Sequence, residues 1–292
     1  MIIYFDNGKN PFTPLFSACG EPLIMPYNRK LKIKVIRKLE KLPFIWNFLY
    51  NKKEIVPKPD ETIIVFDSNM SGAFLQWLKK KFPDNRIIFW YWNPVRTTFQ
   101  PDAIPEGIER WSYSPEDCEK YGLKYNTTFY FDTLVENLPT TRKTGKKVLF
   151  VGRDKGRLSE LLEWKHSLEK QGLECDFYII GQQDPSGFCI KSELGYDEVF
   201  RLIMESDIII DYYTDPNAGL SLRPMEAMFL EKKLITNNIT IRNYDFYSDS
   251  NIFICQNSFD GIQSFISKEY QTVKKEIKDQ YLLSSWKASF DR

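Results

Sequence analysis

One loop of this sequence combines glycine with closely spaced cations and could hold an anion. It follows the apolar run Val148–Val151 and reads Gly-Arg-Asp-Lys-Gly-Arg. Gly152 would let the backbone approach a ligand closely, and the neighbouring N–H groups and cations would bind a diphosphate. The cations are Arg153, Lys155 and Arg157. The loop is neither a P-loop nor a Gly-x-Gly-x-x-Gly motif, and a solvated turn with ordinary surface charges is the alternative.

A second candidate site reads Gly-Leu-Ser-Leu-Arg-Pro-Met-Glu and ends at Glu226. Pro224 favours the first turn of a helix. The N–H groups near Ser221 and Leu222 would then be free to bind an anion, and Arg223 would add charge. Glu226 lies one turn further along and could accept hydrogen bonds from ribose hydroxyls. The alternative is that this carboxylate only complements the helix dipole.

The elements that must position both loops are strands and helices in alternation. In the second half this alternation predicts βαβ units and a parallel, Rossmann-like sheet. The predicted strands are 147–152, 175–181, 208–213 and 233–236, and the predicted helices are 158–171, 196–205 and 222–230. Ligands of such sheets sit beyond the carboxyl ends of the strands. The loops after Val151, Ile180 and Tyr213 should therefore carry the chemistry.

The first half predicts a second parallel sheet. Ile63–Phe66 is continuously apolar, which is typical of a strand covered on both faces. Asp67 ends this strand and is the first candidate for a general base. Asp6, at the end of the first strand, is the second candidate, and either carboxylate could instead cap a turn. The run Trp90–Pro94 could stack on sugars, with core packing as the alternative.

The order of motifs in the second half resembles the donor-binding half of GT-B glycosyltransferases. The resemblance covers Phe150–Arg153, Phe177–Gly181, Gly195–Val199, Ser206–Ile208, Gly219–Ala227 and Lys233–Asn237. It implies an α/β protein with two Rossmann-like domains that face each other across a cleft, and with helices at the C-terminus. It also implies transfer of a sugar from a nucleoside diphosphate, with a UDP-sugar favoured. The sequence further looks like bacterial enzymes that build lipopolysaccharide or capsule.

The resemblance implies roles for individual residues. Gly152 and Arg153, with Lys155 or Arg157, would approach the diphosphate, and Glu226 would bind the ribose. The segment near Tyr196 would lie beside the nucleotide base. One departure matters: many retaining members have a glutamate where this chain has Ala218, so retaining stereochemistry is not implied. The sequence also lacks the Asp-x-Asp element of metal-dependent GT-A enzymes, and we expect no cofactor and no essential metal.

The expected domain boundaries follow from a polar stretch. Residues 138–147 show no apolar period, which is typical of a linker. We expect an acceptor-binding domain at 1–138, a linker at 139–146 and a nucleotide-sugar-binding domain at 147–292. The acceptor would be a saccharide or a lipid-linked saccharide.

A basic segment precedes the central strands of the first half. On a helix at 29–41, Leu31, Val35, Leu39 and Leu42 would form an apolar stripe beside a cluster of cations. This pattern suits docking on an anionic membrane surface, and a helix packed on its own domain is the alternative. The residues expected at the membrane are Lys30, Lys34, Arg37, Lys38, Lys41 and Trp46.

Composition excludes several classes of protein. With 40 basic and 39 acidic residues the net charge is +1, which argues against a nucleic-acid binder. One histidine, His166, and five scattered cysteines make a zinc site improbable and predict reduced thiols. The sequence shows neither a signal peptide nor a membrane span, so we expect a cytoplasmic enzyme, peripheral on the inner face of the membrane. A nucleotide-sugar epimerase and a non-catalytic, membrane-docked partner of a transferase are the alternatives.

Overall fold

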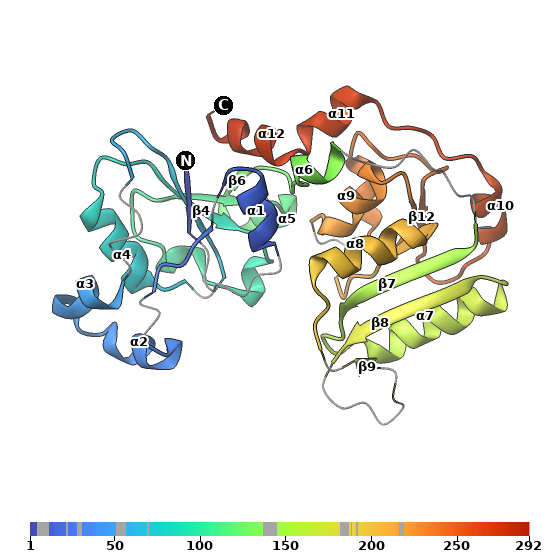
Figure 1. Cartoon of the computed structure of the whole chain (residues 1–292), viewed down its shortest axis with the longest axis horizontal. Coiled ribbons are helices and arrows are strands. Elements are labelled where there is room, and N and C mark those ends of the chain that lie inside the picture. Colours follow the sequence, from blue (N-terminus) through green and yellow to red (C-terminus); the bar gives the residue numbers. More distant parts are fainter. Residues whose placement is uncertain are drawn as a thin grey trace. The chain divides into compact units, whose positions relative to one another are not determined.

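The protein folds into two compact units in a computed structural model, Met1–Thr127 and Thr128–Arg292. In the part of the chain that the structure describes, each unit has a six-stranded sheet of its own (Figure 1). The structure describes residues 1–4, 12–21, 23–27, 31–50, 57–68, 70–136, 145–181, 187, 189–190, 192–215 and 219–291. Asp6, Lys30, Ala218 and most of the expected linker lie outside these residues.

The sheet of the first unit is parallel throughout its described strands. Its order is β2-β1-β3-β4-β5-β6. The strands are β1 (Ile2–Tyr4), β2 (Leu23–Ile24), β3 (Ile63–Phe66), β4 (Ile87–Tyr91), β5 (Glu109–Ser112) and β6 (Lys124–Tyr125). Strands β3 and β4 pair in register, with Ile64 opposite Ile88, and every residue of both is buried. The prediction of strands covered on both faces is therefore confirmed.

Local signals in the sequence set the two best-defined helices of this unit. Ser71 caps α4 by accepting a hydrogen bond from the N–H of Phe74, and Ser114 caps α5 in the same way. Gly122 ends α5 in the left-handed conformation, which glycine adopts without strain. The helical segments are α1 (Thr13–Ala18), α2 (Ile33–Leu39), η1 (Pro43–Ile45), α3 (Trp46–Leu49), α4 (Gly72–Lys81), η2 (Val95–Thr97), η3 (Pro101–Ala103) and α5 (Pro115–Tyr121).

The basic segment differs from its expected form. Helix α2 is shorter than the predicted helix at 29–41, and its buried residue is Ile36 rather than Val35. Trp46, expected at a membrane, is buried, and its indole N–H donates to the carbonyl of Glu40 at 2.8 Å. Arg37 is half-buried, pairs with Glu40 at 3.1 Å and lies over the ring of Tyr27. The predictions for Trp46 and for the helix bounds are wrong because α4 offers apolar surface that the sequence alone does not reveal.

The sheet of the second unit is also parallel in its described strands. Its order is β12-β11-β10-β7-β8-β9, which is the doubly wound order of a Rossmann sheet. The strands are β7 (Lys147–Arg153), β8 (Glu174–Ile180), β9 (Cys189–Ile190), β10 (Ile208–Asp211), β11 (Lys233–Thr236) and β12 (Ile252–Ile254). The prediction of a Rossmann-like sheet in this half is confirmed.

Helices connect these strands and continue to the end of the described chain. They are α6 (Asp132–Val135), α7 (Leu158–Lys170), α8 (Tyr196–Glu205), α9 (Leu222–Phe229), η4 (Ile239–Asn243), α10 (Ile262–Ser267), α11 (Lys275–Gln280), α12 (Leu283–Ala288) and η5 (Ser289–Asp291). Two adjacent lysines fix two of the helix ends. Lys232 donates to the carbonyl of Met204 at 3.1 Å, and Lys233 donates to that of Ile266 at 2.9 Å. These cations satisfy carbonyls that a helix C-terminus leaves unpaired.

The first unit ends at Thr127, whereas we expected residues 128–138 to belong to the first domain. The difference is due to an aromatic segment at the start of the second unit. Tyr130 forms a parallel bridge with Leu282 and stacks on Phe229, with ring centroids 5.1 Å apart. Phe129 packs on Trp286 at 4.6 Å. The segment joins the second unit because its rings are buried there.

Candidate functional site

The strands that precede the loops singled out from the sequence, β7, β8 and β10, lie side by side and parallel in the second sheet. Strand β7 pairs with β8 on one side, as Figure 1 shows, and with β10 on the other. The chain leaves β7 toward β8 and β9, and then returns to build β10 to β12 on the opposite side. At such a switch point the loops diverge and leave a crevice beyond the carboxyl ends of the strands, where ligands of doubly wound sheets bind.

Two arginines from different loops anchor their guanidinium groups at this edge. Arg157 donates to the backbone carbonyl of Tyr212 and to that of Arg153, the latter at 3.2 Å. Arg223 donates to the carbonyl of Val151. Backbone anchors hold both forks in place before any ligand arrives, which favours recognition of an anion.

Both guanidinium groups lie over the ring of Phe150. The distance from Cζ to the ring centroid is 5.6 Å for Arg157 and 5.5 Å for Arg223. Arg157 is buried, and its Nε has no hydrogen-bond partner among the residues that the structure describes. Burial and the nearby charge of Arg223 lower the pKa of Arg157. Two cations thus stand close together in partly desolvated surroundings, and a bound anion would relieve their repulsion.

Gly152 leaves the space that one of these arginines occupies. A Cβ at this position would lie 2.7 Å from Nη2 of Arg223 and 3.1 Å from the Phe150 ring. The sequence suggested that this glycine lets a ligand approach the backbone. In the structure, the space beside it holds a guanidinium group instead.

We expect Gly152→Ala to displace Arg223 and to weaken ligand binding at the site. Overpacking of this kind costs about 1–3 kcal/mol of stability, measurable as a lower midpoint in urea unfolding. Gly195→Ala is the matched control, because a Cβ at Gly195 meets nothing within 4 Å and its φ of −64° suits alanine. Equal stabilities for the two variants would contradict this account of Gly152.

A buried carboxylate lies beside the second arginine. Asp211 ends β10 with 1% of its surface exposed, and its Oδ1 accepts a hydrogen bond from Oγ of Ser221 at 3.0 Å. The same oxygen lies 3.5 Å from Nη1 of Arg223. Burial raises the pKa of Asp211, while Arg223, Tyr213 and Ser221 act in the opposite direction. Asp211 thereby fixes both Ser221 and Arg223 at the start of α9.

The remaining cations of the first loop are exposed. Arg153 pairs with Glu193, and Lys155 has a positive φ of 52°. Desolvation and the charges of Arg157, Arg223 and Arg153 lower the pKa of Lys155. A lysine whose ammonium form is disfavoured by three neighbouring cations is the kind of group that an anionic ligand stabilises.

Glu226 lies one turn into α9 and is almost fully buried, at 5% exposure. Its Oε1 accepts a hydrogen bond at 3.0 Å from the hydroxyl of Tyr196, whose oxygen lies 3.2 Å from the hydroxyl of Tyr130. Burial raises the pKa of Glu226 to about 7. Tyr196 is thus a buried support of the carboxylate, and its expected contact with a nucleotide base stays a prediction.

In the first unit, Asp67 is buried at the end of β3 and has 3% of its surface exposed. Its Oδ2 accepts hydrogen bonds from the backbone N–H of Asn93 at 2.9 Å and from Nδ2 of the same residue at 3.3 Å. Burial raises the pKa of Asp67 to about 7, near the value that suits a general base. Asp67 also ties the ends of β3 and β4 together, and its catalytic role stays a prediction.

Trp90 and Tyr91 are fully buried, which favours core packing over sugar stacking for these two rings. Trp92 is half-buried, and its ring lies 5.1 Å from that of Phe66 and 5.5 Å from that of Phe12.

Sequence reasoning missed several residues that shape the site. Asp211 is the clearest, since a carboxylate at the end of an apolar strand was recognised at Asp67 but not here. Asn237, which follows β11, accepts from the N–H of Tyr213 at 2.8 Å and donates to its carbonyl at 2.7 Å. This pair fixes the loop after β10. The position of Asn237 after a strand was visible in the sequence, whereas its partner was not.

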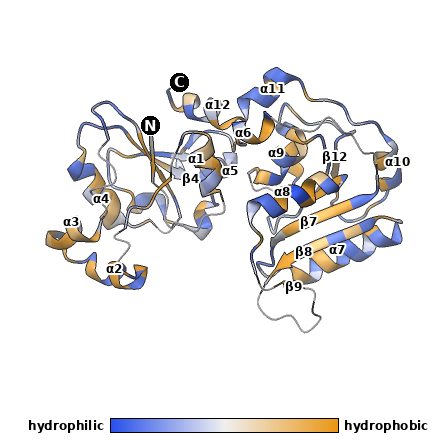
Figure 2. Cartoon of the chain, in the orientation of Figure 1, coloured by the Kyte–Doolittle hydropathy of each residue, from blue (hydrophilic) through white to orange (hydrophobic). Residues whose placement is uncertain are grey.

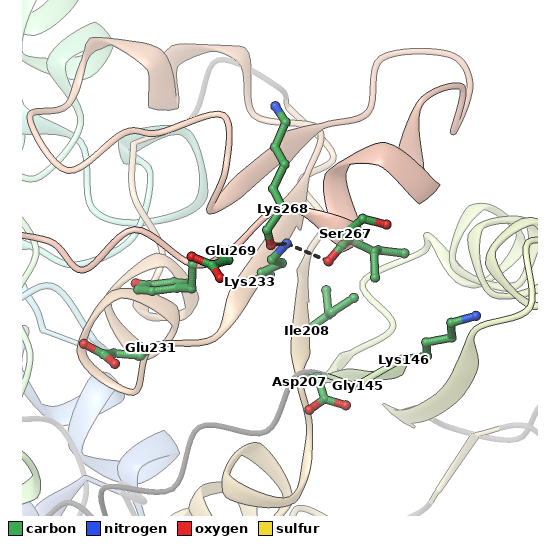
Figure 3. A pocket seen from close by; sticks show the side chains of 11 residues that line it. Gly145, Lys146, Asp207, Ile208, Glu231, Lys233, Ser267, Lys268 and Glu269 are labelled. Atoms are coloured by element: carbon green, nitrogen blue, oxygen red, sulfur yellow. Dashed lines mark hydrogen bonds between the residues drawn. The ribbon is translucent and has the colours of Figure 1, made fainter.

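A surface pocket of about 430 Å³ lies at the opposite edge of the second sheet (Figure 3). Lys146, Asp207 and Lys233, at the amino ends of β7, β10 and β11, line it. Lys233 is already bound by backbone carbonyls, and Asp207 accepts from the N–H of Lys147 at 3.0 Å. The pocket is remote from the arginines, and we assign no ligand to it.

In the described part of the chain, no group of three His, Cys, Asp or Glu side chains is arranged to hold a metal ion. His166 is exposed on α7. All five cysteines are free thiols. No helix within the described ranges has the length and apolar character needed to cross a bilayer.

Comparison with solved structures identifies the fold. The crystal structure of TarM gives a TM-score of 0.52 at 12% identity, over 87% of this chain and 56% of TarM. The chain has the GT-B fold. It spans little more than half the length of TarM. The similarity therefore shows the fold and does not assign the activity of TarM to this chain.

Two further GT-B structures are similar at lower scores. One is a point mutant of S. aureus TarM in complex with fondaparinux, alpha-GlcNAc-glycerol and UDP. It gives a TM-score of 0.47 at 13% identity, covering 88% of this chain and 55% of that one. The other is a putative UDP-N-acetylglucosamine 2-epimerase from Listeria monocytogenes, with 0.49 at 9% identity, covering 99% and 96%. No protein-family model and no curated protein sequence matches the chain.

Proposed function

We propose that this protein is a glycosyltransferase that moves a sugar from a nucleoside-diphosphate sugar to the hydroxyl of a saccharide or lipid-linked saccharide. The observation that carries the proposal is the pair Arg157 and Arg223, anchored by backbone carbonyls over Phe150 at the switch point. A diphosphate supplies the negative charge that these partly desolvated cations lack. As the leaving group of sugar transfer, it also gains charge in the transition state.

The other residues of the edge have roles that fit this donor. Glu226, one turn further along α9, would accept hydrogen bonds from the ribose hydroxyls. Arg153 and Lys155 are exposed and would close over the outer phosphate. Because the cations can neutralise the diphosphate themselves, we propose that no metal is essential. UDP is the favoured nucleotide, as the resemblance of the motifs implies.

The first unit would bind the acceptor. In an inverting reaction a base removes the proton of the acceptor hydroxyl while that oxygen attacks the anomeric carbon and the nucleoside diphosphate leaves. Asp67 is our first candidate for this base and Asp6 the second. We place the enzyme in the cytoplasm, in the assembly of a bacterial surface polysaccharide, in line with the sequence resemblance.

The test is thermal unfolding with UDP, GDP, ADP, CMP and TDP, each with magnesium and with EDTA. We expect one nucleoside diphosphate to stabilise the protein. At 100 times its dissociation constant the gain is roughly 2.7 kcal/mol, which raises the unfolding midpoint by roughly 2–4 °C for each kcal/mol. The shift should persist in EDTA and vanish in Arg157→Ala. The proposal would be overturned if none of the five nucleotides raised the unfolding midpoint.

The assay must also separate transfer from the two alternative functions. An epimerase converts the nucleotide sugar without an acceptor, whereas a transferase releases the nucleoside diphosphate only when an acceptor hydroxyl, or slowly water, receives the sugar. A non-catalytic partner would bind the nucleotide weakly or not at all. It would catalyse neither the epimerisation of the nucleotide sugar nor the transfer of the sugar. Product analysis with and without acceptor therefore distinguishes all three.

A further inference from the structure

Exposed apolar side chains gather in one short segment of the first unit. Among the described residues, seven large hydrophobic side chains are exposed, and five of them lie between residues 33 and 48. The five are Ile33, Val35, Leu42, Phe44 and Phe48. Phe44 is 80% exposed and Phe48 is 63% exposed. Figure 2 shows hydrophobic colouring along α3 and a mixture of both colours on α2.

The opposite side of this segment explains why these residues face outward. Ile36, Trp46, Leu49 and Tyr50 belong to the same buried cluster as the apolar residues of α4. The ring of Tyr50 lies 5.3 Å from that of Phe74 and 5.1 Å from that of Trp77. The segment therefore already has its own core contacts, and Phe44 and Phe48, four residues apart, are left on the outside.

Cations surround the exposed apolar residues. Lys32, Lys34, Lys38 and Lys41 are exposed, and the acidic residue of this segment, Glu40, is buried. Glu40 also pairs with Arg37 at 3.1 Å and accepts from Oγ of Ser71 at 2.7 Å. The outer face of residues 32–48 therefore combines aromatic and aliphatic side chains with four exposed lysines.

We propose that this face, the α2–α3 surface, docks on an anionic lipid membrane. Apolar side chains at the centre enter the boundary between headgroups and acyl chains, and long lysine side chains reach the lipid phosphates. A protein partner of matching hydrophobicity would not by itself account for four lysines. The proposal does not depend on the transfer reaction, although it would bring the first unit to a lipid-linked acceptor.

Co-sedimentation with vesicles tests the proposal. The unmodified protein should bind vesicles that contain phosphatidylglycerol and should bind much less to phosphatidylcholine alone, with binding reduced by salt. Phe44→Ser/Phe48→Ser should lower binding by at least about tenfold. Lys34→Gln/Lys38→Gln should lower it by about fivefold for each lysine, which corresponds to about 1 kcal/mol each.

Matched variants control for general hydrophobicity and charge. Ile239→Ser changes an exposed apolar residue of the second unit, and Lys146→Gln/Lys274→Gln removes two exposed lysines there. Both should bind like the unmodified protein, and nucleotide binding should be unchanged in all four variants. Failure of the unmodified protein to bind anionic vesicles would overturn the proposal. Self-association that Phe44→Ser/Phe48→Ser abolishes, without vesicle binding, would overturn it in favour of an interface between copies.

Discussion

Arg223→Ala should lower turnover by about 100- to 1,000-fold, the usual loss when one fixed donor to a developing charge is removed. Arg223 is held by the carbonyl of Val151 and lies beside buried Asp211. Its loss removes a cation from the proposed diphosphate site and leaves a buried carboxylate without its ion partner. Steady-state kinetics and a nucleotide titration of the variant measure the effect.

The same substitution should destabilise the fold in a pH-dependent way. Arg223 lowers the pKa of Asp211, which burial raises above its usual range. Without Arg223 the pKa of Asp211 in the folded state rises further. The folded state then loses more stability relative to the unfolded state as the pH increases. We expect the free energy of unfolding to fall by on the order of 2 kcal/mol at neutral pH. The loss should be smaller in acid, where Asp211 is protonated in both the folded and the unfolded state.

Two further variants make this prediction specific. Arg201→Ala removes an exposed arginine that pairs with Glu205 on α8, and such surface pairs contribute only about 0.3–0.5 kcal/mol. It should leave turnover unchanged. Adding Asp211→Asn to Arg223→Ala should recover part of the lost stability but none of the turnover. If Arg223→Ala keeps full activity, the proposed donor site is wrong.

Asp67→Asn should stabilise the protein at neutral and alkaline pH while abolishing most of its activity. Burial raises the pKa of Asp67 from 3.8 to about 7. Between these two values the folded state keeps a proton that the unfolded state releases. The contribution of Asp67 to stability therefore falls as the pH rises through this window and stays low above it. Asparagine has no such ionisation, and its side-chain carbonyl can still accept from the N–H of Asn93.

The expected gain is on the order of 3 kcal/mol above pH 7, measured by urea unfolding across the pH range. Turnover should fall by at least about 100-fold if Asp67 is the base. Asp84→Asn, at an exposed position of the same unit, should change neither quantity. A variant that gains stability and keeps its turnover would show that Asp67 is only a structural tie between β3 and β4.

Much of the fold could be predicted from local patterns. The apolar run Ile63–Phe66 predicted a covered strand, and the alternation after residue 147 predicted a parallel sheet. The motif Ser-Pro-Glu-Asp is typical of a helix start, and α5 begins at Pro115 with Ser114 as its cap. These signals succeed because burial of a strand and capping of a helix depend on residues close together in the chain. The same argument located the loops after β7 and β10.

Other features could not be read locally. Trp46 was wrongly predicted to lie on the outward face of residues 33–48. The helical pattern alone does not show which apolar side chains α4 covers. Residues 128–136 were assigned to the first unit, although Tyr130 pairs with Leu282, far along the chain. Asp211 was overlooked because its significance depends on a partner that only the folded chain brings near.

The sequence by itself determined the residue types at the candidate site: glycine after a strand, cations in two loops and a carboxylate on a helix. Only the tertiary structure decided how they act together. Arg223 binds the carbonyl of Val151, 72 residues away, and Arg157 binds that of Tyr212, 55 residues away. These contacts exist because the sheet places β10 directly beside β7, which periodicity along the chain cannot specify.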